Sequence, residues 1–297
     1  MNFIIRISVV IIVINFLFPQ IVEKIDPNAP VFPDWTTDAV WYQIFPERFR
    51  NGDAQNDPDI HSLAGTWPYD LQLKWDITPW TDDWYKLQPW EDSNKRGFYY
   101  NAQLRRYGGD ILGIIEKLDY LKELGINAIY LNPVFESPSS HKYGAVYYHH
   151  IDNNFGPSPD GDAMIWATED PADPSTWKFT TADRLFLALI EEVHARGMHI
   201  IIDGVFNHVG IPFWALEDVK RNGKISRYAD WFTITSWDDP DTPQDEFDYE
   251  GWYGIRDLPE LREDENGLID PVADHVHAIV KRWMDPNGDG DTSDGID

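Results

Sequence analysis

Short apolar runs alternate along this chain with longer stretches in which apolar residues recur every three or four positions. The short runs are rich in β-branched and aromatic residues and are bounded by polar residues or proline, which is typical of buried strands. They lie at Ala39–Phe45, Ala128–Leu131 and His199–Phe206. The longer stretches have the spacing of amphipathic helices. They cover Ile111–Leu124, Thr180–Gly197 and Asp270–Pro286, and Gly295–Asp297 predicts the start of a fourth strand.

Residues that start and stop helices support these boundaries. Thr180 and Asp183 have the spacing of a capping box at the start of the second helix. Asp270, followed by Pro271, is expected to cap the third helix. Gly125 follows the first helix at the position where glycine commonly ends one.

The lengths of the connections indicate the fold class. Strands that alternate with helices form parallel sheets. Helix-to-strand connections are short here, whereas each strand-to-helix connection runs to dozens of residues, so the long connections all leave one edge of the sheet. In a barrel that edge is the C-terminal face, where active sites are built. We therefore predict an α/β fold, the first half of a (β/α)8 TIM barrel that is incomplete in this chain. A doubly wound sheet is the alternative, because three strands cannot show closure.

The chain divides into four expected segments. A secretory signal is expected at residues 1–25, because Phe3–Phe18 is largely apolar yet shorter than the roughly 20 residues that span a membrane. Export to the periplasm or the medium follows; the alternative is a mis-assigned start codon before a cytoplasmic enzyme. The other segments are the barrel strands one to three with long loops (26–208), an inserted subdomain (209–269), and the third barrel helix with the start of strand four (270–297).

Composition excludes several classes of partner. Asp and Glu number 51 against 24 Lys and Arg, a net charge of −27 that repels nucleic acid and anionic membrane surfaces. The absence of cysteine excludes disulfides, thiolate zinc sites and cysteine nucleophiles. An acidic chain with 14 Trp, 14 Tyr and 15 Phe suits neutral sugars and hard cations. A soluble acidic enzyme with a large aromatic core is the plainer interpretation of the same numbers.

The third predicted strand ends in the string DGVFNH, residues 203–208. Polar groups directly after an apolar strand lie at the mouth of a barrel, so Asp203, Asn207 and His208 are expected to converge on one pocket. The alternative is structural: the first two would satisfy loop backbone groups, and His208 would be a packed core histidine.

Four segments resemble, in the same order, the motifs of glycoside hydrolase family 13, the α-amylase family. They are VWYQIFPERFRNGD at 40–53, GGDILGIIEKLDYLKELGINAIYLNPVFESPSSHKY at 108–143, HARGMHIIIDGVFNHVG at 194–210 and LPEL at 258–261. Within the family, NGDAQND and HKY are similar to the neopullulanase and cyclomaltodextrinase branch. The resemblance covers nearly the whole chain and implies a TIM-barrel glycosidase acting on an α-glucan oligo- or polysaccharide.

The resemblance implies a role for each residue of the expected sugar pocket. Tyr143 would stack under the sugar ring on the non-reducing side of the cleaved bond, a task suited to a flat apolar face with a polar tip. His208 would hydrogen-bond a hydroxyl of that sugar, Asp203 would shape the pocket floor, and Asn207 would support the loop. The alternative for Tyr143 is an ordinary loop aromatic.

A calcium site is expected in the first long loop, where NGDAQND offers oxygens at close spacing and the resemblance adds the GGD turn. Ca²⁺ takes about six to eight oxygen ligands in loose geometry. The expected ligands are Asn51, Asp53, Asn56, Asp57, the carbonyl of Gly108, and Asp110. The alternative is a polar turn nucleated by Asn51-Gly52.

A second acidic loop, DPNGDGDTSDG at 285–295, begins with the spacing of an EF-hand. Ile296 stands where the bidentate Glu of that motif belongs, so a bound ion would have to recruit Asp294 or another segment. The ligands of this second metal site would be Asp285, Asn287, Asp289 and Asp291. A solvated acidic turn is the alternative.

The carboxylates that cleave the bond in this family have no counterpart here. Retaining cleavage needs a nucleophilic carboxylate and a carboxylic acid about 5 Å apart. The resemblance places the nucleophile in a G-x-R-x-D string directly after Asp297, so we expect the isolated chain to be inactive. We expect the full-length protein to cleave α-1,4 glucosidic bonds, with α-1,6 bonds as a further option. The alternatives are a transglycosylase or isomerase of the same family, and a non-catalytic barrel scaffold.

Overall fold

The computed structural model describes residues 32–297. The chain forms two compact units, Met1–Ala39 and Val40–Asp297. The described part of the first unit holds the 3-10 helix η1 (Asp34–Asp38). The expected secretory signal, residues 1–25, lies outside the described residues. Among residues 32–297, no helix has the length and apolar character needed to cross a membrane.

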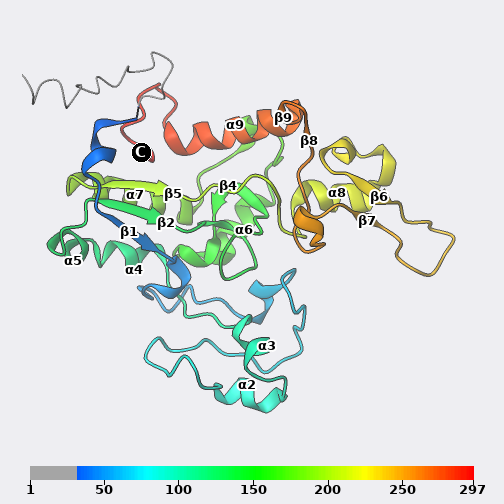
Figure 1. The fold of residues 1–297 in the computed structure, drawn as a ribbon, viewed down its shortest axis with the longest axis horizontal. Coiled ribbons are helices and arrows are strands. Elements are labelled where there is room, and N and C mark those ends of the chain that lie inside the picture. The colour runs from blue at the N-terminus through cyan, green and yellow to red at the C-terminus, as the bar shows by residue number, and fades with distance from the viewer. Residues whose placement is uncertain (1–31) are drawn as a thin grey trace, which may run out of the picture. The chain divides into compact units, whose positions relative to one another are not determined.

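The larger unit contains a parallel sheet of three strands, in the order β1-β2-β5 (Figure 1). The strands are β1 (Trp41–Ile44), β2 (Ala128–Leu131) and β5 (His199–Ile202), so all three predicted strands form. Tyr42 pairs with Ile129, which pairs with Ile200, in one continuous register. The parallel arrangement follows from the strand–helix alternation, because each strand returns through a crossover helix.

The third strand is shorter than predicted, because its pairing stops at Ile202 rather than at Phe206. The N–H of Asp203 still donates to the carbonyl of Leu131 (2.9 Å), and the chain then leaves the sheet. The polar string that begins at Asp203 is therefore loop, held at the carboxyl edge of the sheet.

Helices follow the strands at the predicted places. They are α4 (Ile111–Ile115), α5 (Leu118–Glu123), α7 (Thr181–Ala195) and α9 (Asp270–Met284). The single helix expected over 111–124 is split, because the N–H of Lys117 bonds the carbonyl of Ile114 at 2.9 Å and tightens the turn. The predicted capping box of α7 forms between Thr180 and Asp183.

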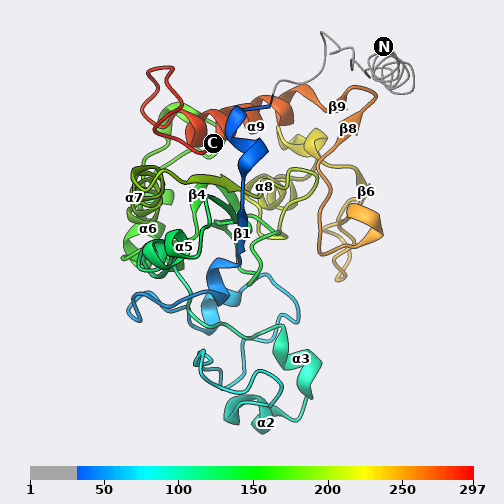
Figure 2. The same ribbon diagram turned by 60° about the vertical axis from the view of Figure 1, so that its left-hand side comes forward.

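The predicted cap of α9 is wrong. The N-cap residue is Ile269, and no side chain caps this end. Asp270 is instead the first residue of the helix, where its carboxylate complements the positive end of the helix dipole. Figure 2 shows α5, α6 (Pro159–Trp166) and α7 on one side of β1, and α8 (Trp214–Asn222) and β6 (Ile234–Ser236) on the other.

Apolar faces of the helices and sheet form one core. Ile111, Ile114, Leu118 and Leu121 of α4 and α5 are completely buried, as are Phe186, Leu189 and Val193 of α7 and Ile129 and Leu131 of β2. Trp283 of α9 closes this core at 1% exposure and donates its indole N–H to the carbonyl of Tyr148 at 3.0 Å. Burial of such side chains stabilises the fold by about 1.5–3 kcal/mol each.

Three long excursions leave the carboxyl ends of the strands. The excursion after β1 contains η2 (Pro46–Arg48), η3 (Ile60–Leu63), α2 (Pro89–Asn94) and α3 (Phe98–Ala102). The excursion after β2 contains β3 (Phe135–Glu136), β4 (Tyr147–Ile151), η4 (Asn153–Phe155), α6 (Pro159–Trp166) and η5 (Pro174–Thr176). The excursion after β5 contains α8 (Trp214–Asn222), η6 (Gly223–Ile225), η7 (Ala229–Trp231), β6 (Ile234–Ser236), β7 (Asp248–Tyr249), η8 (Trp252–Gly254), β8 (Glu263–Asp264) and β9 (Gly267–Leu268).

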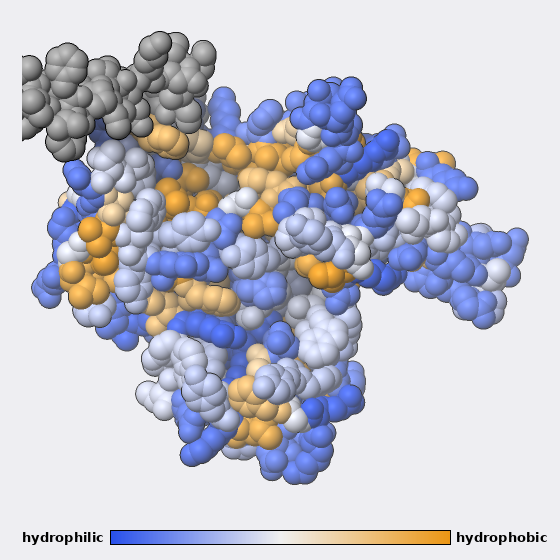
Figure 3. Space-filling view, viewed as in Figure 1, coloured by the Kyte–Doolittle hydropathy of each residue, from blue (hydrophilic) through white to orange (hydrophobic). Residues whose placement is uncertain are grey.

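The surface is mostly polar but carries several apolar patches (Figure 3). Large apolar side chains that are at least a third exposed include Val40 beside β1 and Val280 and Met284 on α9. Isolated exposed apolar residues are ordinary on proteins, whereas an apolar face on a sheet or helix is expected to have a packing partner.

Candidate active site

Side chains from the ends of all three strands are linked by hydrogen bonds. The Tyr143 hydroxyl donates to Oδ2 of Asp203 at 2.9 Å, and the Asn132 amide lies 3.4 Å from the same hydroxyl. Gln43 of β1 donates its amide to Oδ1 of Asn132 at 2.9 Å. The Tyr130 phenol is close enough to Asp203 to be influenced by it: burial, with this carboxylate, raises the pKa of Tyr130. The structure thus brings together Tyr143 and Asp203, which sequence reasoning had singled out.

Gln43, Tyr130 and Asn132 are site residues that sequence reasoning missed. Each stands near the last position of a strand, directly before a long excursion. Position at a strand end is the signal that could have found them, because carboxyl ends of parallel strands meet at one edge.

His208 is held rigidly beside the Tyr143 loop. Its ring Nδ1 bonds Oδ1 of Asn207 at 2.5 Å, and its ring stacks on Trp252 with 5.3 Å between centroids and 22° between planes. Burial lowers the pKa of His208, although a contact with the Tyr143 backbone acts the other way, so the ring is neutral. Because Nδ1 donates to Asn207, Nε2 carries the lone pair, and no atom among residues 32–297 has hydrogen-bonding geometry to this buried nitrogen. Such an atom is suited to accept a hydrogen bond from a ligand hydroxyl.

The loop after β5 is clamped by two neighbouring segments. The Tyr148 hydroxyl donates to the carbonyls of Val205 (2.7 Å) and His208 (2.8 Å). The segment 258–261, the LPEL string, runs beside it: His208 forms an isolated antiparallel bridge with Glu260. The motifs DGVFNH and LPEL are therefore adjacent in space although about fifty positions apart in sequence.

The expected calcium ligands lie together around the Asp110 carboxylate. That carboxylate accepts hydrogen bonds from the backbone N–H groups of Asp53 (2.8 Å) and Gly113 (2.6 Å) and from the Asn56 amide (3.2 Å). The amide of Asn51 donates to Oδ1 of Asp57 at 2.5 Å.

Gly108 closes the same cluster from the GGD turn. A Cβ on this residue would lie 2.1 Å from Oδ1 of Asp57 and 2.5 Å from Nδ2 of Asn51. Its φ of +70° is one that residues with a side chain rarely adopt. Only glycine therefore permits this close approach.

Two observations test whether these residues fit a cation. Oδ1 of Asn56 is buried and has no hydrogen-bond partner among the described residues. Burial, together with the neighbouring carboxylates Asp110 and Asp53, raises the pKa of Asp57 to about 6, although the Asn51 hydrogen bond acts the other way. A bound cation such as Ca²⁺ would reduce the repulsion between these carboxylates and would give the unpaired oxygen a partner. The residues therefore fit a calcium site.

The second acidic loop is folded by its own side chains. Asn287, Asp289 and Asp291 each accept the N–H two residues further on, at 2.8, 2.8 and 2.9 Å. Oδ2 of Asp285 accepts the N–H of Gly290, whereas Oδ1 of Asp285 and Oδ1 of Asp294 are buried and without a partner among the described residues. The metal site expected here stays a prediction.

Sequence reasoning missed a buried group of ionisable side chains beneath the second excursion. His150 lies between two carboxylates, with Nδ1 2.9 Å from Asp183 and Nε2 2.8 Å from Glu169. Arg282 of α9 bonds the same Asp183 carboxylate at 3.2 Å. We call His150, Glu169, Asp183 and Arg282 the buried ion cluster; their side chains are at most 9% exposed.

The buried ion cluster is electrically balanced when His150 is protonated. Burial opposes the charge, but hydrogen bonds to Asp183 and Glu169 outweigh it and raise the pKa of His150. Nε2 of the neighbouring His149 lies 3.7 Å from Glu169. His149, His150 and Glu169 are near enough to one another to hold a metal ion. Because two cations already face two carboxylates, a divalent ion would leave buried excess positive charge, so the group is better explained as an ion network.

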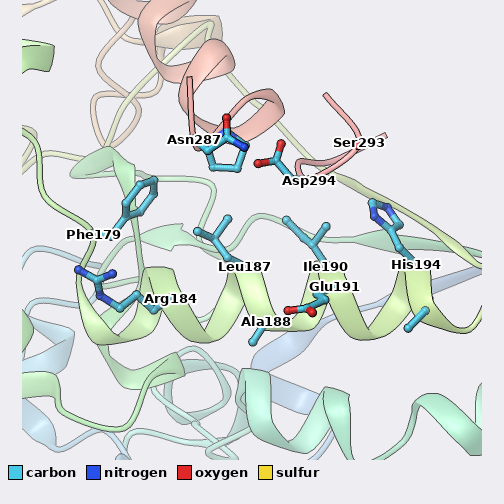
Figure 4. A pocket seen from close by; sticks show the side chains of 12 residues that line it. Phe179, Arg184, Leu187, Ala188, Ile190, Glu191, His194, Asn287, Ser293 and Asp294 are labelled. Carbon is cyan, nitrogen blue, oxygen red and sulfur yellow. The ribbon is translucent and has the colours of Figure 1, made fainter. Parts of the chain in front are cut away.

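A separate cavity of about 970 Å³ lies between α7 and the loop after α9, lined by Leu187, Ile190, His194 and Asp294 among others (Figure 4). None of Tyr143, Asp203 and His208 lines it, so it is not part of the site described above.

Comparison with known proteins identifies the family of this chain. The family described as "Alpha amylase, catalytic domain" matches residues 43–171 and 176–292. The chain belongs to the α-amylase family. The resemblance found in the four sequence motifs is therefore confirmed.

Named relatives in the α-amylase family agree with the expected branch. A cyclomaltodextrinase of Thermoanaerobacter pseudethanolicus is 37% identical over 222 residues, which cover 75% of this chain and 28% of that protein. Neopullulanase 2 of Thermoactinomyces vulgaris is 35% identical over 260 residues, covering 87% of this chain and 34% of that protein. The chain thus spans about a third of the length of these curated relatives.

Solved structures of the α-amylase family are also similar. The type III pullulan hydrolase from Thermococcus kodakarensis has a TM-score of 0.60 at 30% identity, with 84% of this chain and 36% of that chain covered. A cyclic α-maltosyl-(1→6)-maltose hydrolase from Arthrobacter globiformis has a TM-score of 0.58 at 30% identity, with 89% and 44% covered. Family and neighbours together indicate the TIM-barrel glycosidase fold.

Proposed function

We propose that the protein carrying this chain is a glycoside hydrolase that cleaves α-1,4 glucosidic bonds, and also α-1,6 bonds, in α-glucans with retention of configuration. The observation that carries the proposal is a pair of groups in the loops after β2 and β5: a Tyr143 ring oriented by Asp203, and a neutral His208 whose buried Nε2 is an acceptor. Relatives named cyclomaltodextrinase and neopullulanase support the substrate class.

The residues of this chain would bind and orient one sugar ring. The hydrogen bond from Tyr143 to Asp203 holds the phenol in one rotamer, so its face is ready to stack against the ring at little entropic cost. Nε2 of His208 would accept a sugar hydroxyl proton. Asn207 holds Nδ1 of His208 and thereby keeps this lone pair on Nε2. Orientation of the reacting bond is the contribution that such groups make to the rate.

Asp203 acts here as a positioning residue. Its carboxylate accepts the hydrogen bond of the Tyr143 hydroxyl, and we assign it the task of orienting that ring rather than of attacking or protonating the substrate. We propose that the nucleophile and the acid belong to polypeptide beyond Asp297, in a G-x-R-x-D string and later strands, and that this chain alone is inactive. The curated relatives are about three times as long as this chain, which supports placing the nucleophile and the acid in a further part of the protein.

The three strands are proposed to be the first part of an eight-stranded barrel, with Val209–Ile269 as an inserted subdomain. In support, the N–H of Asp297 donates to the carbonyl of Ile200 at 3.0 Å, a contact that a fourth strand beside β5 would extend. Further strands would also cover the exposed apolar side chains near β1 and α9.

Calcium is proposed as a structural ion at Asn51, Asp53, Asn56, Asp57, Gly108 and Asp110. Bound there, it would neutralise the carboxylates that join the first excursion to the start of α4. A second calcium ion is proposed in the acidic loop 285–295, where Asp285 and Asp294 each have a buried carboxylate oxygen without a partner among the described residues. Export of the protein remains our proposal for its location.

The test uses the complete protein, assayed on pullulan, starch and cyclodextrins with analysis of the products. Tyr143→Ala is expected to lower kcat/KM by roughly 10- to 100-fold, the equivalent of losing about 1.5–3 kcal/mol of ring burial. Tyr120→Ala removes a tyrosine of α5 that is 54% exposed and should have no effect. A wild-type protein that binds these glucans without cleaving them would favour the scaffold, and transfer products in place of hydrolysis would favour a transglycosylase.

A further inference from the structure

The dipeptide Asn-Gly occurs four times in this chain, at residues 51–52, 222–223, 266–267 and 287–288. Asparagine is thermolabile, and it loses its side-chain amide most easily before glycine, because glycine has no side chain to shield its main-chain nitrogen from the Cγ of the asparagine. Asn-Gly is also favoured in tight turns. Because the dipeptide is the same at all four sites, the local structure decides which of them can react.

Asn51-Gly52 is held at both reacting groups. The Asn51 amide donates to Oδ1 of Asp57 at 2.5 Å, and the N–H of Gly52 donates to Oδ1 of Asp110 at 3.1 Å. The site is also crowded, since a Cβ on Gly52 would lie 2.4 Å from the main-chain nitrogen of Gly113. The nitrogen of Gly52 is therefore not available to attack the side chain before it.

Asn222-Gly223 is exposed, but the end of α8 holds it in place. The Asn222 amide donates to Oδ2 of Asp218 at 2.9 Å. The N–H of Gly223 donates to the carbonyl of Val219 and so ends the helix. Two hydrogen bonds have to break before this pair can react.

Asn287-Gly288 lies in the acidic loop 285–295 and is held in a similar way. Oδ1 of Asn287 accepts the N–H of Asp289 at 2.8 Å. The N–H of Gly288 donates to the carbonyl of Asp285 at 3.2 Å. This exposed pair also has to break two hydrogen bonds before it can react.

Asn266-Gly267 differs from the other three sites. It lies in the turn of the β8–β9 hairpin, next to the start of α9 (Figures 1 and 2). The Asn266 side chain is exposed and has no hydrogen-bond partner among residues 32–297. A Cβ on Gly267, at φ +111°, would have no atom within 4 Å, so its surroundings are open. Gly267 pairs with Asp264 in a hairpin with two residues in each strand, and so short a hairpin opens readily.

We propose that Asn266 is a site of spontaneous deamidation, selected from the four Asn-Gly pairs by the fold. The main-chain nitrogen of Gly267 attacks Cγ of Asn266, its proton leaves with the side-chain NH2 as ammonia, and a succinimide ring forms. Water then adds to one of the two ring carbonyls and opens the ring to aspartate or isoaspartate. The reaction needs only water, and the inference does not depend on the proposed function.

The product changes both the charge and the main chain of the hairpin. It adds a negative charge directly after three acidic residues, 263–265. Isoaspartate also lengthens the main chain by one methylene group and so displaces Gly267 from its pairing. Beside the hairpin, the N–H of Ile269, the N-cap residue of α9, donates to the carbonyl of Arg262 at 3.2 Å. The modification is therefore expected to loosen the connection between the LPEL segment and α9.

The test follows all four dipeptides in the complete protein during incubation at pH 8 and 37 °C. Peptide mass spectrometry measures conversion at each site, and ion exchange separates the acidic isoforms. Asn266 is expected to convert at least about tenfold faster than each of the other three, because each of those has two hydrogen bonds to break. After unfolding in urea the four rates should agree within about threefold, since the protection given by the fold is lost.

Asn266→Gln retains an amide but would have to form a less favourable six-membered ring, so it should remove the main acidic isoform. Asn222→Gln is the matched control, because it changes another exposed Asn-Gly pair and should leave that isoform unchanged. Conversion of Asn266 no faster than that of another pair in the folded protein overturns the proposal. A tenfold advantage of Asn266 that persists in urea also overturns it, because the flanking sequence and not the fold would then select the site.

Discussion

Glu169→Gln is expected to destabilise the fold strongly, because it removes one charge from the buried ion cluster. The carboxyl group is 1% exposed and lies 2.8 Å from His150. Burial works against its charge, yet hydrogen bonds from His149 and His150 lower the pKa of Glu169 from 4.5 to about 2. That shift corresponds to about 3 kcal/mol of stabilisation at pH 7, which agrees with the roughly 3–5 kcal/mol lost when one partner of a buried ion pair is removed.

The assay is thermal unfolding of the complete protein at pH 7, followed by circular dichroism or calorimetry. A loss of 3 kcal/mol lowers the melting temperature by about 6–12 °C in a domain of this size. Glu123→Gln changes an exposed glutamate on α5 and is the control, with an expected shift below about 2 °C. If the melting temperature falls no further in Glu169→Gln than in the control, the Glu169 charge does not stabilise the buried ion cluster.

Two further predictions concern pH and calcium. The pKa of His150 in the folded state is raised above 6.5, so its contribution to stability is complete below about pH 6.5 and declines as the pH rises through the raised pKa. Unfolding in urea at pH 6 and at pH 9 measures this decline. In His150→Gln the difference in unfolding free energy between the two pH values should be smaller than in the wild type. Asp57→Ala should abolish the rise in melting temperature on adding calcium, whereas Asp92→Ala, an exposed change in α2, should retain it; an unchanged calcium shift in Asp57→Ala would contradict the site.

Much of the fold was predictable from periodicity. The strand Ala128–Leu131 and the capping box at Thr180 form as predicted, because burial on both faces and a local side-chain bond decide them. The predicted helix 111–124 splits and the cap of α9 moves to Ile269, because main-chain hydrogen bonds to neighbouring turns decide those details. Periodicity reports which face is buried but says little about where the last turn ends.

The candidate site was predictable only in part. Tyr143, Asp203 and His208 could be named because they stand in motifs or directly after a strand. Trp252 carries no such signal; it matters because it stacks on His208. Likewise Glu169 and Arg282 become one ion cluster only when α9 packs near the second excursion.

Periodicity and motifs are enough to indicate the family, the order of strands and helices, and the residue types at the strand ends, because these features depend on local propensity and on the burial of apolar positions close in the chain. Which polar groups meet follows from tertiary packing: the Tyr143–Asp203 hydrogen bond, the stacking of His208 on Trp252 and the buried ion cluster. Hydrogen bonds and stacking act over a few ångströms, so they depend on how distant segments pack, and a linear pattern does not specify that packing.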